Sequence, residues 1–234
     1  MSQVVTALAA RLRDRTRLGL PVRALARDGE RWRLTVGSAR DATDLDADGV
    51  VLAVPAAPAA RLLSGMEGAQ LIGRLNYASV ALVTLALPDV ELPELSGFLV
   101  PATAGFGVKA ATFFDRKWAH LQRPGISVVR TSLGRYGDEA ILQCDDASLV
   151  SLAHAELGKL LGRSLPAPVE ARVRRWGGAL PQYAPGHLGR VATARAQMPP
   201  TLTLAGAAYD GVGVPACVKS GQVAADRVLQ GLGA

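Results

Sequence analysis

The spacing of apolar residues divides the chain into a mixed beginning, a β-rich middle and a mixed end. Apolar residues recur with a helical period over residues 2–15. Residues 21–27 then predict a strand, which a turn at residues 28–30 joins to the alternating strand 31–36. The beginning of the chain therefore predicts a helix followed by a β-hairpin.

An aspartate-rich segment follows the hairpin and ends at Gly49. Asp41, Asp44, Asp46 and Asp48 lack the glycine and glutamate spacing of a calcium loop, so a solvated loop is predicted here. Residues 50–54 are continuously apolar, which is typical of a strand covered on both faces. Pro55 ends that strand, and residues 56–63 predict a helix.

The middle of the chain predicts an antiparallel sheet. Short β-rich segments at residues 79–87, 98–100, 108–114 and 126–132 are separated by proline and glycine turns. The next segment, residues 146–162, has the apolar period of an amphipathic helix. Asp146 or Ser148 is its predicted cap.

The end of the chain returns to alternating strands and helices. Residues 169–176 predict a strand, 176–183 an irregular stretch, and 186–197 a helix. Arginines 172, 174 and 175 on that strand are predicted to face solvent in part, the alternative being that one meets a substrate carboxylate.

These elements predict a nested, mixed α/β fold with an antiparallel sheet inserted between two parts of one α/β layer. The predicted boundaries are residues 1–68, 69–184 and 185–234. A chain of 234 residues with 49% hydrophobic content is long enough for a sizeable core.

Composition narrows the classes of function. The net charge is +6, but the arginines are scattered and aromatic residues are only 5%, which argues against a stacked nucleic-acid platform. Cys144, Cys217 and the three histidines are dispersed, so no disulfide framework or metal site is predicted. No signal peptide or membrane span is recognisable, so the expected location is the cytosol or its membrane surface.

Residues 201–230 carry the clearest candidate chemistry. A buried strand leads into a turn containing Gly206, Gly211 and Gly213, and Pro215 then occupies the first turn of a long helix. Such a turn aims backbone N–H groups and the positive end of a helix dipole at a phosphate. Glycine spacing alone fits a plain strand–turn–helix connection equally well.

Three stretches together are distinctive. WGGALPQYAPGHLGRV (176–191), LAGAAYDGVGVPACVKSG (204–221) and SGFLVP (96–101) resemble the FAD-dependent protoporphyrinogen and coproporphyrinogen oxidases of the flavin amine-oxidase superfamily. PVRAL (21–25) and GVVLAVPA (49–56) extend the resemblance over essentially the whole chain in the family's order. The resemblance implies a Rossmann-like FAD-binding domain, residues 1–68 and 185–234, with a substrate-binding domain inserted between them.

One family feature is absent. The G-x-G-x-x-G dinucleotide fingerprint and its acidic ribose-binding residue do not occur in this sequence. We therefore expect the chain to correspond to the C-terminal portion of a longer enzyme and to be inactive alone.

The resemblance implies oxidation of a porphyrinogen to the porphyrin in heme biosynthesis, with FAD as cofactor and molecular oxygen as acceptor. It also implies peripheral contact of the full-length protein with a membrane. The substrate that the resemblance implies is coproporphyrinogen III or protoporphyrinogen IX, and the arginine excess favours the former, which carries more carboxylates. No nucleophile–base pair is recognisable, so no catalytic residue is named.

The resemblance also implies positions for a cofactor and a substrate. Val22 would hold the adenine side through its backbone, and Trp176 would flank the flavin ring. Gly97 and Leu99 would line the substrate wall. The remaining cofactor positions are Ala53, Pro55, Gly206, Gly211, Val212, Gly213, Val214 and Pro215. The turn at residues 206–213 would face the ribityl chain and the ring, and for every position the alternative is packing.

Two other functions remain open. One is a different flavin oxidase, such as an amine oxidase, against which the SGFLVP and WGGALPQY stretches argue. The other is a fragment that binds a tetrapyrrole without turnover, which the absent fingerprint favours.

Overall fold

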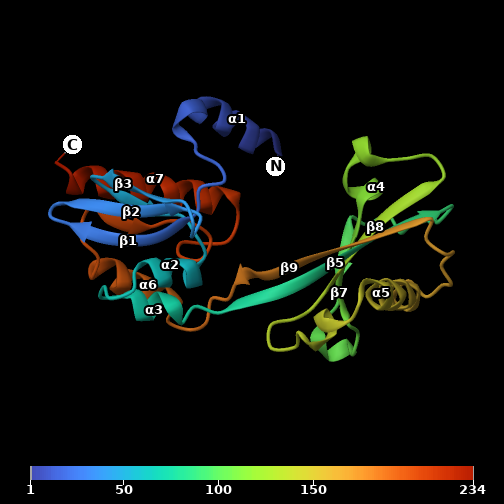
Figure 1. The fold of residues 1–234 in the computed structure, drawn as a ribbon. Coiled ribbons are helices and arrows are strands. Elements are labelled where there is room, and N and C mark those ends of the chain that lie inside the picture. The colour runs from blue at the N-terminus through green and yellow to red at the C-terminus, as the bar shows by residue number, and fades with distance from the viewer. Residues whose placement is uncertain (1, 234) are drawn as a thin grey trace. The chain divides into compact units, whose positions relative to one another are not determined.

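The computed structural model describes residues 2–233, which form two compact units (Figure 1). The first unit comprises Met1–Leu75 and Tyr183–Ala234, and the second comprises Asn76–Gln182. The first boundary lies after helix α3 (Ala69–Gly73) and not before it as predicted, because α3 packs on helices α2 and α6 of the first unit. The functional roles predicted for the two units stay predictions.

The first unit combines two small sheets with helices. Its first segment contains α1 (Ser2–Leu12), η1 (Arg13–Arg15), β1 (Val22–Asp28), β2 (Arg31–Gly37), β3 (Ala42–Ala47), β4 (Val50–Leu52), α2 (Ala56–Leu62) and α3. Its second segment contains α6 (His187–Ala196), β10 (Leu202–Leu204) and α7 (Val214–Gly231). The predicted helices and strands of this unit are confirmed, with β3 and α3 added.

β1, β2 and β3 form an antiparallel meander. The prediction of a polar loop at residues 37–49 was wrong, because β3 pairs with β2 from Trp32↔Ala47 to Gly37↔Ala42. Its acidic side chains are satisfied across the ladder: Thr35 Oγ1 donates to Asp44 at 2.8 Å, and Arg33 Nε lies 3.6 Å from Asp46 Oδ1. An edge strand tolerates such charged, outward-facing residues.

β4 and β10 pair in parallel, with Leu52 opposite Leu204. Helix α7 packs on this pair through a buried stripe of Ser220, Ala224 and Val228. β4 has an apolar sequence, but Val51 is 37% exposed, so the prediction that strand 50–54 is covered on both faces was wrong for this chain. The strand is also shorter than predicted.

The second unit is a five-stranded antiparallel sheet in the order β6-β7-β8-β5-β9 with helix α5 on one face (Figure 1). Its strands are β5 (Tyr77–Pro88), β6 (Gly97–Leu99), β7 (Val108–Phe113), β8 (Ile126–Leu133) and β9 (Glu170–Pro181). Its helical segments are η2 (Ala102–Ala104), α4 (Phe114–Lys117), η3 (Ala119–Leu121), η4 (Ala140–Gln143) and α5 (Asp146–Leu160). The predicted antiparallel sheet is confirmed.

The core of the second unit lies between one face of the sheet and α5. Val83 and Leu85 of β5, Phe113 of β7, and Leu149 and Leu157 of α5 are fully buried in it. The helix is capped by Asp145, whose carboxylate accepts from the Ser148 N–H at 2.7 Å. The prediction of Asp146 or Ser148 as the cap was therefore wrong by one or more positions, since all three are polar and only geometry distinguishes them.

The stretch at residues 176–181, which was expected to be irregular, continues strand β9. Its pairing with β5 shifts register between Ala78 and Val80 and then resumes at Leu180 and Pro181. Gly178, with φ of 53°, allows the shift, and its N–H donates to Ser79 Oγ at 3.0 Å. A bulge of this kind lets a glycine-rich segment remain in a sheet.

Candidate functional site

The carboxyl ends of β4 and β10 meet at one edge of the parallel pair. Ala205 N–H donates to the Leu52 carbonyl at 3.1 Å, so the chain leaves both strands together. Ala53 and Pro55 follow β4, and Gly206 follows β10. The structure thus brings these three predicted residues to the edge where parallel sheets bind ligands.

The turn between β10 and α7 depends on its glycines. Gly206, Gly211 and Gly213 have φ of 120°, 134° and 119°, which side chains other than glycine rarely adopt. A Cβ added at Gly206 or Gly213 would meet no atom within 4 Å, whereas at Gly211 it would lie 3.1 Å from the Ala216 Cβ. Bare backbone at residues 206 and 213 therefore borders open space that a ligand can approach closely.

Helix α7 begins at this turn, with Gly213 as its N-cap and Pro215 in its first turn. The first N–H groups of a helix have no intrahelical acceptor and carry a partial positive charge. The side chains of Val212 and Val214 are exposed beside them. The arrangement suits a polar or anionic group flanked by apolar surface.

A charged network holds the turn in place. Arg195 of α6 donates to both Asp210 oxygens at 2.6 Å and to the Leu204 carbonyl at 2.8 Å. Ser220 of α7 donates to Asp210 and accepts from the Gly206 N–H at 2.8 Å. The network links α6, β10, the turn and α7, and it fixes the direction of the Gly206 backbone.

Burial opposes ionisation of Asp210, but the hydrogen bonds from Arg195 and Ser220 and the charge of Arg195 outweigh it and lower the pKa of Asp210. The carboxylate is thus charged at neutral pH. This network was not predicted from the sequence. An aspartate between glycines in the turn was the available signal, but its arginine lies on another helix.

Two tyrosines and a histidine fix the rest of the turn. Tyr209 donates to the Val54 carbonyl at 2.9 Å, and Tyr183 donates to the Ala207 carbonyl at 2.6 Å. His187 stacks on Tyr183 with ring centroids 3.9 Å apart, and its Nε2 lies 2.9 Å from the Ala208 carbonyl. Because a carbonyl only accepts, Nε2 carries the proton. Nδ1 is buried with no hydrogen-bond partner among residues 2–233.

A cavity of about 480 Å³ lies beside β1 and β4. Val22 and Ala53 both line it, so the structure brings one further predicted cofactor residue, Val22, beside Ala53. Most of the lining is apolar, and Arg23 and Arg61 supply its positive charge. Such a cavity suits an apolar ring system that carries an anionic group.

The remaining predicted positions lie in the second unit. Gly97 has φ of 148°, and a Cβ there would lie 2.1 Å from the Ala111 carbonyl oxygen, so only glycine fits. Leu99 is 84% exposed and Trp176 is 49% exposed. Neither side chain is part of the core, so the packing alternative is not supported for these two residues.

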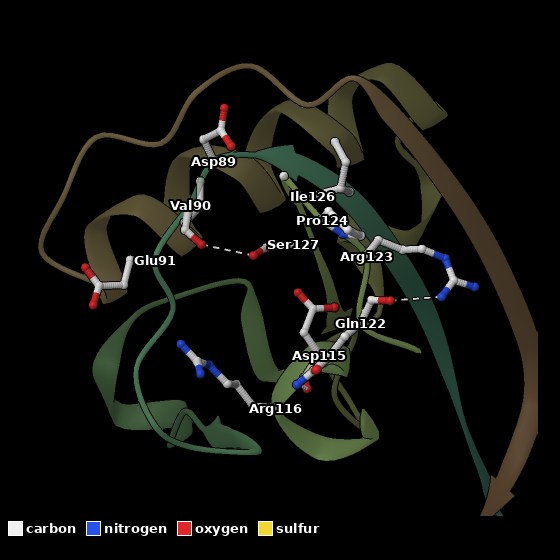
Figure 2. Close-up of a pocket in the computed structure, with 11 residues that line it drawn as sticks. Asp89, Val90, Glu91, Asp115, Arg116, Gln122, Arg123, Pro124, Ile126 and Ser127 are labelled. Carbon is white, nitrogen blue, oxygen red and sulfur yellow. Dashed lines mark hydrogen bonds between the residues drawn. The ribbon is translucent and has the colours of Figure 1, made fainter. Parts of the chain in front are cut away.

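A second hollow, of about 610 Å³, lies between the ends of β5 and β8 (Figure 2). Asp115 accepts from the Val128 N–H, and Ser127 donates to the Val90 carbonyl. Arg116 pairs with Glu94 at 2.8 Å. The charged groups of this hollow thus stabilise the local structure, and none of the predicted site residues lines it.

The profile of the family described as flavin containing amine oxidoreductase matches residues 1–229. The chain belongs to this family. Coproporphyrinogen III oxidase of Mycobacterium tuberculosis is 42% identical over 191 residues, which are 80% of this chain and 42% of the relative. Protoporphyrinogen oxidase of Macaca fascicularis is 31% identical over 231 residues, which are 90% of this chain and 46% of the relative.

A solved structure assigned as a protoporphyrinogen oxidase, from Exiguobacterium sp. 255-15, matches with a TM-score of 0.81 at 29% identity, covering 98% of this chain and 51% of that one. These matches confirm the predicted family and fold class of this flavin oxidoreductase relative. The chain spans about half the length of the proteins that it matches.

No helix in residues 2–233 is long and apolar enough to cross a membrane. The same residues contain no group of three histidine, cysteine or acidic side chains placed to hold a metal ion.

Proposed function

We propose that this flavin oxidoreductase relative provides part of an FAD site and the substrate sheet of a porphyrinogen oxidase, which converts coproporphyrinogen III or protoporphyrinogen IX to the porphyrin. The observation that carries the proposal is the turn at residues 206–213. It combines bare glycine backbone, a helix N-terminus and a partly exposed charged network in a chain whose relatives are named as porphyrinogen oxidases.

The residues of the first unit fit FAD. The open space at Gly206 and Gly213 admits a ring or chain at van der Waals distance from the backbone, and Val212 and Val214 border it. Ala53 and Pro55 adjoin the same edge of the sheet, and Val22 lines the apolar cavity. In the proposal, Val22 holds the adenine side, and Gly211 and Pro215 support the turn that faces the flavin.

Bound FAD supplies a hydride acceptor for the substrate, and oxygen is the proposed final acceptor of the electrons. The chain contributes position: the Asp210 network fixes the Gly206 N–H, and the turn excludes side chains from the face where the ring would lie. Trp176 flanks the ring, while Gly97 and Leu99 line the substrate wall. A cytosolic location with peripheral membrane contact of the longer protein belongs to the same proposal.

The experiment is a visible spectrum of the purified chain after incubation with FAD and removal of free flavin. Retained flavin that bleaches without oxygen when coproporphyrinogen III is added, with the appearance of porphyrin fluorescence, supports the proposal. Protein that retains no flavin and produces no porphyrin above the uncatalysed rate contradicts it for this chain.

A second candidate function is tetrapyrrole binding without turnover. It is favoured by the exposed apolar side chains of Leu99 and Trp176 on the second unit. Porphyrin binding by a chain that retains no flavin would support this candidate over the enzyme.

A further inference from the structure

One face of the sheet in the second unit is not covered by α5. Residues directly opposite one another on neighbouring strands share a face. One row of such pairs runs across all five strands, and a second row lies beside it. The first row is Gly97, Thr112, Arg130, Thr84 and Arg172. The second row is Leu99, Ala110, Ser132, Leu82 and Arg174.

The core residues occupy the alternate positions of the same strands, and successive strand residues point to opposite faces of a sheet. These rows therefore lie on the face away from the core. Trp176, opposite Val80, continues the face along β9. We call Arg130, Arg172 and Arg174, with Leu99 and Trp176, the arginine face. Strands lie about 4.8 Å apart, so Arg130 and Arg172, two strands apart, start from backbone positions separated by about 10 Å.

Among residues 2–233, the guanidinium groups of this face have no carboxylate partner. Within residues 2–233, Arg172 and Arg174 make no ion pair or side-chain hydrogen bond, and Arg130 makes only a contact with the Phe114 ring, 5.2 Å from its centroid. By contrast, the neighbouring Arg175 points to the opposite face of the sheet, where it pairs with Asp146 and donates to the Cys144 carbonyl at 2.6 Å. Alternation along β9 thus separates a structural arginine from two free ones.

Negative charge near the face is sparse. Glu170 lies on the same face, two residues before Arg172 at the end of β9. Glu170 and Arg172 both line a hollow of about 400 Å³. Asp115 of α4 accepts from the Val128 N–H, and the same helix carries Arg116 and Lys117. The face is therefore cationic, with exposed apolar surface at Leu99 and Trp176.

We propose, resting on the function proposed above, that the arginine face binds the carboxylates of the tetrapyrrole substrate and favours a tetracarboxylate over a dicarboxylate. Guanidinium groups bind carboxylates in a planar, bidentate manner. Three arginines without an ion-pair partner among residues 2–233 share this face with the exposed Trp176 and Leu99, which matches a planar apolar molecule with anionic arms around its rim. The first row contains Gly97, which leaves that one position of β6 without a side chain.

Binding is measured without flavin or turnover, by the fluorescence of coproporphyrin III, a tetracarboxylate, titrated with the purified chain. The double variant Arg172→Gln/Arg174→Gln is expected to weaken binding about tenfold, since exposed ion pairs contribute up to about fivefold each. Arg130→Gln is expected to weaken it about threefold. Protoporphyrin IX, a dicarboxylate, should bind more weakly to the unmodified chain and lose less affinity in the variants.

The matched control is Arg123→Gln, which removes an exposed arginine of the same unit outside the face and should change the affinity less than twofold. The tetramethyl ester of coproporphyrin, which has no carboxylate, should not distinguish the variants. The inference is overturned if the unmodified chain does not bind coproporphyrin III, or if the double variant and the control bind it equally well. If the chain oxidises a porphyrinogen despite such a result, the proposed function remains supported and only the arginine face is rejected.

Discussion

Single glycines set the geometry of the turn between β10 and α7. We expect Gly213→Ala to destabilise the chain by about 2 kcal/mol, because φ of 119° is strained for any residue with a Cβ. The Cβ would also enter the open space beside the backbone, so flavin retention should fall. Thermal unfolding and the visible spectrum measure the two effects.

The control for this prediction is Gly221→Ala. Gly221 lies inside α7 and has open space around it, so alanine should leave stability unchanged or raise it by about 0.5–1 kcal/mol. Equal stability of the two variants would show that the turn does not require its glycine.

The Asp210 carboxylate makes part of the stability depend on pH. Its pKa in the folded chain lies below its ordinary value, so its contribution is complete above the ordinary value and disappears as the pH falls through the lowered pKa. Asp210→Asn is expected to cost about 2 kcal/mol at pH 7 and progressively less below about pH 4. Urea unfolding between pH 7 and pH 3 measures this difference.

Asp226→Asn is the control for the pH effect, because Asp226 is exposed on the same helix α7. It should change stability by less than about 0.5 kcal/mol across the range. A difference between Asp210→Asn and the unmodified chain that does not vary with pH would contradict the assignment of the charge to Asp210.

At the scale of elements, one buried hydrogen bond joins the meander to the strand that leads into the turn. Trp32 is 1% exposed, and its Nε1 donates to Thr201 Oγ1 at 3.0 Å. Thr201→Val should cost about 2 kcal/mol, because it leaves the buried indole N–H without an acceptor. Thr201→Ser retains the hydroxyl and should cost less, and chemical unfolding of the two variants tests the difference.

Most elements were predictable because their apolar residues recur with the period of the helix or strand that they form. The sequence predicted β1, β2, α5 and α7 from local spacing alone, and glycine and proline marked the turn before α7. β3 was missed because its alternating aspartates resemble a solvated loop, and only the cross-strand contacts of Thr35 and Arg33 stabilise them. The extent of β9 was missed because the bulge at Gly178 depends on Ser79, which is far away in the sequence.

The candidate site was predictable where glycine or proline carried the signal. Gly97, Gly206 and Gly213 all have backbone geometry that requires glycine. The link between Asp210 and Arg195 was not predictable, since it depends on how α6 packs beside β10. The sequence also could not show that Arg174 and Arg175 serve different faces of the sheet, because that depends on how β9 pairs with β5.

At the scale of the whole molecule, the second unit is one contiguous segment with its own core. We expect residues 76–182 to fold alone, with a cooperative thermal transition in circular dichroism. Leu157→Ala, which empties a fully buried position in that core, should destabilise the isolated segment by about 3 kcal/mol. A segment that shows no transition, with or without the substitution, would contradict its independence.

The entry and exit of the second unit are neighbours. Gln182 N–H donates to the Asn76 carbonyl at 2.8 Å, and Tyr77 lies opposite Pro181 in the ladder. Adjacent chain ends are the arrangement in which an inserted domain is tolerated. During evolution, a single exchange of genetic material at these two points could replace the entire sheet and its arginine face while leaving the glycine turn of the first unit intact. Substrate range and cofactor use could then diversify by separate routes.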